Sequence, residues 1–242
     1  MTHSRFVGAD GCKGGAWVCV ATDGRGAWSI AVHASIGAVW DASRGAERVL
    51  LDIPIGLMEH GRRACDVAAR RSLGSRRSSV FPSPERWLLA CTSLAEADGL
   101  KSEREGRAVR VQRQMWNILP RVREVDAWLR QTPPARAIVR ECHPELCFMG
   151  LSGRPMGHNK KTVEGRGERI ELLREHVPAV GEMLADALTR WPRSVLAADD
   201  VVDAVVAAVC AAAPDNVLRT VPSTPEVDEH GLPMEMVYRL PG

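Results

Sequence analysis

The chain has 242 residues, of which 45% are hydrophobic and 26% are charged, and its formal net charge is +2. These values are ordinary for a soluble globular protein with a sizeable core, and they exclude a global polyelectrolyte signal for nucleic-acid binding. The seven cysteines contain no CxxC pair and are odd in number. This argues against a disulfide framework or a zinc knuckle and predicts reduced thiols in a cytoplasmic protein.

The first predicted strand ends on a carboxylate and a glycine-rich turn. Residues 6–9 are apolar and lead directly into Asp10, and the segment 11–15 holds three glycines and Lys13. An aspartate at the end of a buried strand is costly unless its charge is compensated, and a bound cation is one such compensation. A hydrogen bond to the turn itself is the structural alternative.

Three more strands and a short helix are expected before the middle of the chain. They lie at 16–22 (strand), 27–34 (strand), 35–43 (helix, with Ser35 as N-cap) and 49–53 (strand). The last strand is an unbroken apolar run that carries Asp52, which suits a central position in a sheet.

The segment from about 57 to 131 is expected to be a helical insertion. Helices are predicted at 61–73, 85–97, 108–117 and 122–130. Residues 62–86 contain seven arginines but only two acidic residues, and Arg62 and Arg63 are candidates for phosphate contacts. The alternative is a surface ladder of ion pairs, because Arg62, Asp66 and Arg70 are spaced four apart.

A fifth strand at 135–141 ends on Glu141 and is followed by His143. His143 could be a general acid, a phosphate contact or a structural histidine. The glycine- and lysine-rich segment 150–167 resembles a mobile loop whose Lys160 and Lys161 could reach a phosphate, or a plain solvated loop.

The end of the chain is expected to form helices and a small hairpin. Helices are predicted at 168–176, 183–190 and 201–213, and the hairpin lies after residue 214. Asp199 or Asp200 is the expected N-cap of the last helix, and Asp203 shares a face with Asp200. The last helix is too short to span a bilayer, and neither a signal peptide nor a membrane contact is expected.

Acidic residues thus end three predicted strands and open the last helix. Oxygen ligands gathered from separate elements are what a hard divalent cation needs, so we expect Mg²⁺ or Mn²⁺ to be bound there. The candidate ligands and catalytic residues are Asp10, Asp52, Glu141, Asp200 and Asp203.

The motifs GADGCKGGAW, LLDIPIGL, ECHPELCF and AADDVVDAVVAA, in this order, resemble the family called domain of unknown function 429. Members of that family are described as predicted nucleases. The resemblance implies a single α/β domain over 1–242 with a ribonuclease H-like fold. It would have a mixed five-stranded sheet flanked by helices, a helical insertion after strand 4 at about 57–131, and a C-terminal extension at about 214–242.

The resemblance also implies roles for the acidic residues. Asp10 would be the first-strand ligand, Asp52 or Glu141 the second-strand ligand, and Asp200 and Asp203 a helix pair, as in Holliday-junction resolvases of the same fold. Our leading hypothesis is a phosphodiester hydrolase with two divalent ions about 4 Å apart, acting on a nucleic acid or nucleotide. The candidate substrate contacts are Lys13, Arg62, Arg63, His143, Lys160 and Lys161.

Two other functions are compatible with the same fold. One is a non-catalytic module that binds nucleic acid or protein. The other is an ATP-dependent phosphotransferase, which would need two such halves and is disfavoured by a chain of 242 residues. The sequence leaves open DNA versus RNA, endo- versus exonuclease action, and the oligomeric state.

Overall fold

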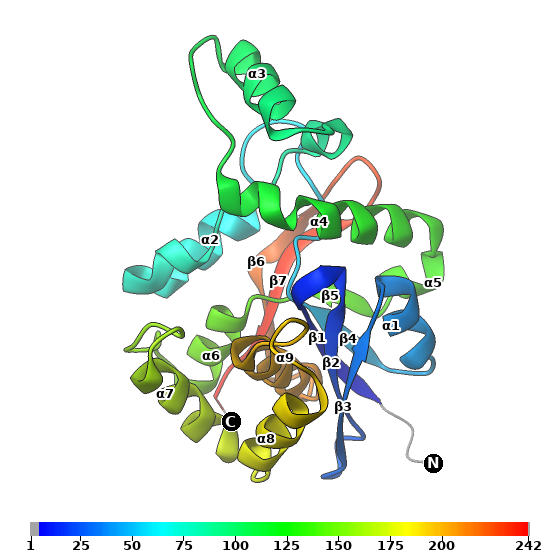
Figure 1. The fold of residues 1–242 in the computed structure, drawn as a ribbon, viewed down its shortest axis with the longest axis vertical. Coiled ribbons are helices and arrows are strands. Elements are labelled where there is room, and N and C mark those ends of the chain that lie inside the picture. The colour runs from blue at the N-terminus through cyan, green and yellow to red at the C-terminus, as the bar shows by residue number, and fades with distance from the viewer. Residues whose placement is uncertain (1–4, 242) are drawn as a thin grey trace.

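A computed structural model describes residues 5–241 and shows a central sheet with helices on both faces (Figure 1). The strands are β1 (Phe6–Gly11), β2 (Trp17–Thr22), β3 (Trp28–His33), β4 (Arg48–Leu51) and β5 (Val139–Glu141). Their order is β3-β2-β1-β4-β5, with β1, β2 and β3 antiparallel and β4 and β5 parallel to β1. The predicted mixed five-stranded sheet is confirmed.

Helices cover the sheet in two layers. One face packs against α6 (Pro144–Ser152), α7 (Val163–Arg174), α8 (Val180–Arg190) and α9 (Ala198–Ala211). The other face packs against α1 (Ile36–Ala42) and α4 (Arg113–Gln131), and α5 (Pro133–Arg136) leads from α4 into β5. Between β4 and α4 the chain forms α2 (Ala64–Leu73), the 3-10 turns η2 (Gly74–Ser79) and η3 (Arg86–Ala90), and α3 (Leu94–Glu105).

Alternation along β1 decides which side chains face α9. Val7 and Ala9 belong to the core on the α1 and α4 side. Successive side chains of a strand point to opposite faces, so Gly8 and Asp10 face α9. A Cβ at Gly8 would overlap the backbone of Ala204 and Ala208. Gly8 therefore lets α9 lie directly on β1, which brings the acidic start of α9 to the end of β1.

Several predicted boundaries are wrong, and local hydrogen bonds explain two of the differences. Segment 150–167 is not a single loop, because α6 continues to Ser152 and α7 begins at Val163, where the Thr162 hydroxyl accepts from Gly165 N–H. The predicted helix at 85–97 is divided between η3 and α3, and Ser93 caps α3. The N-cap of α9 is Ala197, whose N–H donates to the Asp200 carboxylate.

The C-terminal segment forms the predicted hairpin, with β6 (Leu218–Val227) antiparallel to β7 (Pro233–Arg239). A parallel bridge between Cys142 and Val237 attaches β7 to the chain just after β5. All seven cysteines are buried and unpaired, as expected for reduced thiols. None of the helices formed by residues 5–241 combines the length and apolar character needed to cross a bilayer.

Candidate functional site

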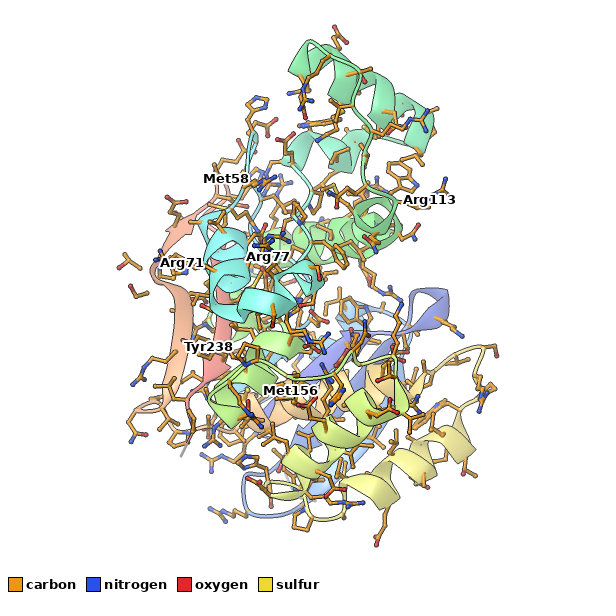
Figure 2. The ribbon with its side chains drawn as sticks, turned by 90° about the vertical axis from the view of Figure 1, so that its left-hand side faces the viewer. Met58, Arg71, Arg77, Arg113, Met156 and Tyr238 are labelled. Carbon is orange, nitrogen blue, oxygen red and sulfur yellow. The ribbon has the colours of Figure 1, made fainter. Side chains whose placement is uncertain are left out.

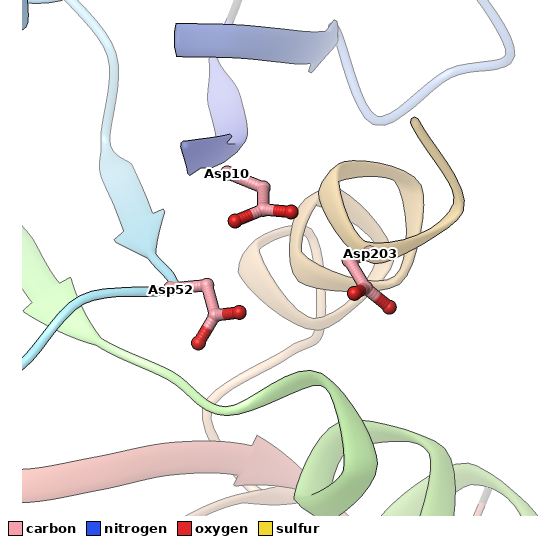
Figure 3. Close-up of side chains that lie close together, drawn as sticks. All are labelled: Asp10, Asp52 and Asp203. Atoms are coloured by element: carbon pink, nitrogen blue, oxygen red, sulfur yellow. The ribbon is translucent and has the colours of Figure 1, made fainter. Parts of the chain in front are cut away.

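Three of the five predicted carboxylates meet in one place (Figure 3). Asp10 ends β1, Asp52 follows β4, and Asp203 lies on α9. One carboxylate oxygen from each residue lies within 4.8 Å of the others, so the three form a group that could hold a metal ion. We call Asp10, Asp52 and Asp203 the carboxylate trio.

The parallel pairing of β1 with β4 places the first two members of the trio side by side. Ala9 is opposite Leu51, and the Asp52 N–H donates to the Ala9 carbonyl at 3.0 Å. Asp10 and Asp52 are the next residues on the two strands, and both point to the α9 face. Asp203 completes the trio from α9, where it is only 2% exposed.

Burial and mutual repulsion raise the pKa values of all three carboxylates. The pKa of Asp10 lies well above its usual value, because the group is buried and also repelled by Asp52 and Asp203. Burial, followed by repulsion from Asp203, raises the pKa of Asp52 to about 8. Burial raises the pKa of Asp203 to about 6, although Lys160 acts against the rise. Carboxylates that repel one another in this way favour a compensating cation.

Lys160 supplies part of that compensation. Its Nζ donates to Asp203 Oδ2 at 2.6 Å. Burial alone would lower the pKa of Lys160, but the Asp203 carboxylate outweighs burial and raises it, so the lysine stays charged. The second oxygen, Asp203 Oδ1, is buried and has no hydrogen-bond partner. A buried acceptor without a partner costs free energy. The all-oxygen donor set and this open acceptor therefore fit a hard divalent cation.

Glu141 is not part of the trio. It is opposite Leu51 in the sheet and so faces the α1 and α4 side, away from Asp52. There it is bound by Arg63, with Nη1 to Oε2 at 2.6 Å and Nη2 to Oε1 at 2.8 Å. Burial raises the pKa of Glu141 to about 7, while Arg63 acts to lower it. The structure thus gives Glu141 a structural partner in place of a metal.

Arg63 is the centre of that buried cluster and cannot meet a phosphate there. It is 1% exposed, and its Nη2 also donates to Asp66 Oδ1 at 2.6 Å. The alternative surface ladder is wrong for the same reason, because Asp66 is buried and pairs with Arg63. Arg70 instead donates to the Val80 carbonyl, and Arg62 is exposed.

The remaining predicted contacts differ in exposure and in hydrogen bonding. His143 is half-buried, and its Nε2 lies 3.2 Å from the Ser79 carbonyl. Burial, followed by the charge of Lys160, lowers its pKa to about 4, so it is neutral at pH 7. Lys161 is exposed in the loop before α7. Lys13 is exposed in η1 (Lys13–Gly15), and its Nζ donates to the Arg193 carbonyl at 2.7 Å.

Asp200 lies beside the trio without joining it. Its Oδ2 accepts from the Ala197 N–H at 2.9 Å, so the carboxylate caps the start of α9. Burial raises its pKa, and the Asp200 charge in turn contributes to the raised pKa of Asp10. Asp200 is therefore not a member of the trio, but it is close enough to interact with it electrostatically.

A cavity of about 540 Å³ adjoins this end of the sheet and is lined in part by Gly11, Lys13, Arg121 and Asp200. Arg121 is a lining residue that the sequence analysis missed. It lies on α4, 109 positions away in the chain from its hydrogen-bond acceptor Cys12. No local signal distinguishes it from the other arginines of that helix.

Comparison with known proteins yields one family. The model of the family described as "Protein of unknown function (DUF429)" matches residues 8–227. No curated protein matches the chain, and no solved structure matches it either. The matched range contains the whole carboxylate trio.

Proposed function

The chain belongs to the family described as protein of unknown function (DUF429), and we propose that it is a divalent-metal-dependent phosphodiester hydrolase with a ribonuclease H-like fold. The strand order β3-β2-β1-β4-β5, with three antiparallel strands followed by two parallel ones, supports the fold. The observation that carries the function is the carboxylate trio, assembled from two neighbouring strand ends and a helix.

The trio would hold Mg²⁺ or Mn²⁺ through one oxygen of each aspartate, and Asp200 is the nearby carboxylate that a second ion would use. A divalent ion at such a site acts as a Lewis acid toward a phosphoryl oxygen and makes water a stronger nucleophile. Asp203 Oδ1, buried without a partner, is the oxygen that gains most from a cation.

The side chains around the trio support a phosphate-containing substrate. Lys160 keeps its charge and lies against the trio, where it can bind a phosphate oxygen. Its loop is attached to η2, because Arg76 Nε donates to the Met156 carbonyl at 2.9 Å. The exposed arginines Arg71 and Arg77, on α2 and η2, are labelled in Figure 2. Exposed arginines on α2 and on η2, the element bonded to the Lys160 loop, supply positive charge that attracts a polyanionic substrate.

The hydrolase assignment is tested directly by incubating the protein with labelled single- and double-stranded DNA and RNA in Mg²⁺, Mn²⁺ or EDTA. Cleavage of at least one substrate in metal and none in EDTA is the expected result. Absence of cleavage of every substrate in both metals would contradict the assignment and leave a binding function on the same fold.

We expect the double substitution Arg71→Gln, Arg77→Gln to weaken nucleic-acid binding without changing the fold. Each lost phosphate contact should reduce the slope of log K against log salt concentration by about 0.7 to 0.9. Binding is measured by fluorescence anisotropy over a salt series in EDTA. The matched control is Arg44→Gln, Arg190→Gln, which removes two exposed arginines outside α2 and η2. An unchanged slope for the first pair would remove this surface from the binding site.

The raised pKa values predict that the metal-free protein loses stability as the pH rises. Unfolded aspartates titrate near pH 3.9, whereas folded Asp203 and Asp52 titrate at about 6 and about 8. Between these values the folded state holds more protons than the unfolded state, so the free energy of unfolding falls from about pH 4 to about pH 8.

Mg²⁺ should reverse this trend, because a cation needs deprotonated ligands and binds more tightly at higher pH. The measurement is urea unfolding at pH 5 and pH 8, in EDTA and in saturating Mg²⁺. Stabilisation by Mg²⁺ that is equal at the two pH values, or absent at both, would contradict a metal bound by these carboxylates.

A further inference from the structure

The cavity beside the trio has chemistry of its own. It lies between the glycine-rich turn 11–15, the α4 residues Asn117 and Arg121, and the start of α9. Its volume, about 540 Å³, is within the range of pockets that hold small molecules and cofactors. No atom lies within 4 Å of the positions that Cβ atoms would take at Gly14 and Gly15, so the turn is open to an approaching ligand.

Arg121 is the charged side chain best placed to bind in this cavity. Its Nη2 donates to the carbonyl oxygens of Cys12 and Ala16, while its Nε is buried without a partner. Within residues 5–241, no carboxylate oxygen lies within 4.0 Å of its guanidinium. Arg63 and Arg169, in contrast, are buried and paired with carboxylates.

This difference distinguishes an arginine whose charge is paired by a carboxylate of the protein from one whose charge a ligand can pair. A buried or half-buried charge is normally paired, and the carbonyl acceptors of Arg121 position the guanidinium without neutralising it. Lys13 also lines the cavity and adds a second positive charge, and its Nζ donates to the Arg193 carbonyl. Asp199 and Asp200 line the cavity as well, and the Asp200 charge acts on Asp10 of the trio. The cavity therefore carries both cationic and acidic side chains, and Asp200 connects it to the trio.

We propose that this cavity binds the phosphate group of a nucleotide, with Arg121 as its main contact and Lys13 as a second one. With Nη2 donating to two carbonyls and Nε buried, Nη1 is the guanidinium nitrogen left to donate a charge-assisted hydrogen bond to a phosphate oxygen. Because Asp200 lines the cavity and also interacts with Asp10, a nucleotide held here would lie beside the trio. The choice of a nucleotide as the ligand rests on the proposed function. Arg121 is a further phosphate-binding residue, which no sequence motif indicates.

The test measures binding of adenosine 5′-monophosphate and of inorganic phosphate by isothermal titration calorimetry, in Mg²⁺ and again in EDTA. Arg121→Gln should weaken binding of both by about 10- to 100-fold, the range expected for a lost hydrogen bond to a charged group. Arg130→Gln, an exposed arginine near the end of the same helix, should bind as the wild type does. Equal affinities for wild type and Arg121→Gln, or equal binding of adenosine and its monophosphate, would overturn the proposal.

Gly11→Ala provides a second variant that keeps every charge. A Cβ at Gly11 would lie 2.6 Å from Arg121 Nε, so the guanidinium must move while the strand backbone, which has no positive φ there, is unaffected. Phosphate binding should fall as it does in Arg121→Gln. Normal phosphate binding by a folded Gly11→Ala protein would overturn the proposal even if Arg121→Gln does not fold.

Further outcomes distinguish a phosphate within a strand from a free nucleotide, and they test the phosphate site independently of the hydrolase assignment. Displacement of bound monophosphate by a short unphosphorylated oligonucleotide supports the cavity as a position along a strand. Monophosphate that stays bound supports a site for a free nucleotide. Arg121-dependent binding in a protein that cleaves no nucleic acid would uphold this cavity while contradicting the hydrolase assignment.

Discussion

The Asp10→Asn variant should lose metal-dependent cleavage by at least about 100-fold, since even groups that only support a metal ligand are worth about 10- to 100-fold. The amide has nearly the shape of the carboxylate but cannot supply its negative charge. The same change should stabilise the metal-free protein, because Asp10 is repelled by Asp52 and Asp203. The gain should grow with pH, since asparagine does not ionise.

These two effects separate a metal ligand from a structural residue. Cleavage rates and urea unfolding in EDTA are measured on the same preparations of wild type, Asp10→Asn and Asp41→Asn. Asp41 is an exposed aspartate on α1 and serves as the control, with no expected change in either quantity. Unchanged cleavage by Asp10→Asn would exclude Asp10 from the mechanism. Lost cleavage together with lost stability would indicate that Asp10 has a structural role.

Replacing Arg63 with methionine should destabilise the fold by about 3 to 5 kcal/mol, the cost of breaking a buried ion pair by removing one partner. Arg63 binds the carboxylates of Asp66 and Glu141 and the carbonyl oxygens of Ile55 and Gly56. Without it, two buried carboxylates share one site and have no counter-charge. The measurement is the free energy of unfolding in urea.

Arg62 provides the matched control, because it is the adjacent residue and is exposed. Arg62→Met should change the free energy of unfolding by less than about 0.5 kcal/mol. The double variant Arg63→Met, Glu141→Gln should recover part of the lost free energy of unfolding, since one of the two unpaired carboxylates is replaced by a neutral amide. A stable Arg63→Met protein with weakened nucleic-acid binding would contradict this role and support Arg63 as a phosphate contact, as the sequence predicts.

Glu141 shows that a position at a strand end does not by itself predict which face of the sheet a carboxylate takes. Asp52 directly follows the apolar run 49–51, and Glu141 follows the run 137–139 with Arg140 between. Their roles diverge because Leu51 is opposite Glu141 in the sheet, so Glu141 shares the face of Leu51 and Asp52 has the other. A register difference of one residue reverses the face of every side chain on a strand.

The sequence predicts the secondary structure better than it predicts the composition of the site. Local signals correctly predicted the first four strands, the Ser35 cap of α1 and the end of α2 at Gly74. The fifth strand is predicted at 135–141 but covers only Val139–Glu141, because α5 extends to Arg136. The start of α7 was missed because a glycine- and lysine-rich composition concealed the Thr162 cap. The shared helix face of Asp200 and Asp203 predicts that they act together, but Asp200 Oδ2 accepts from the Ala197 N–H, so only its other oxygen is left for a second ion.

By itself, the sequence determined the succession of strands along the chain, the acidic residues at their ends and the family, because these depend on periodicity and short motifs that neighbouring residues carry. Tertiary structure alone decided which three of the five candidate carboxylates meet, that Glu141 binds Arg63, and that Arg121 reaches the turn after β1. Each of those outcomes depends on sheet register and on the packing of α9 or α4 against residues far away in the chain. Such packing is a property of the whole fold, and no local segment encodes it.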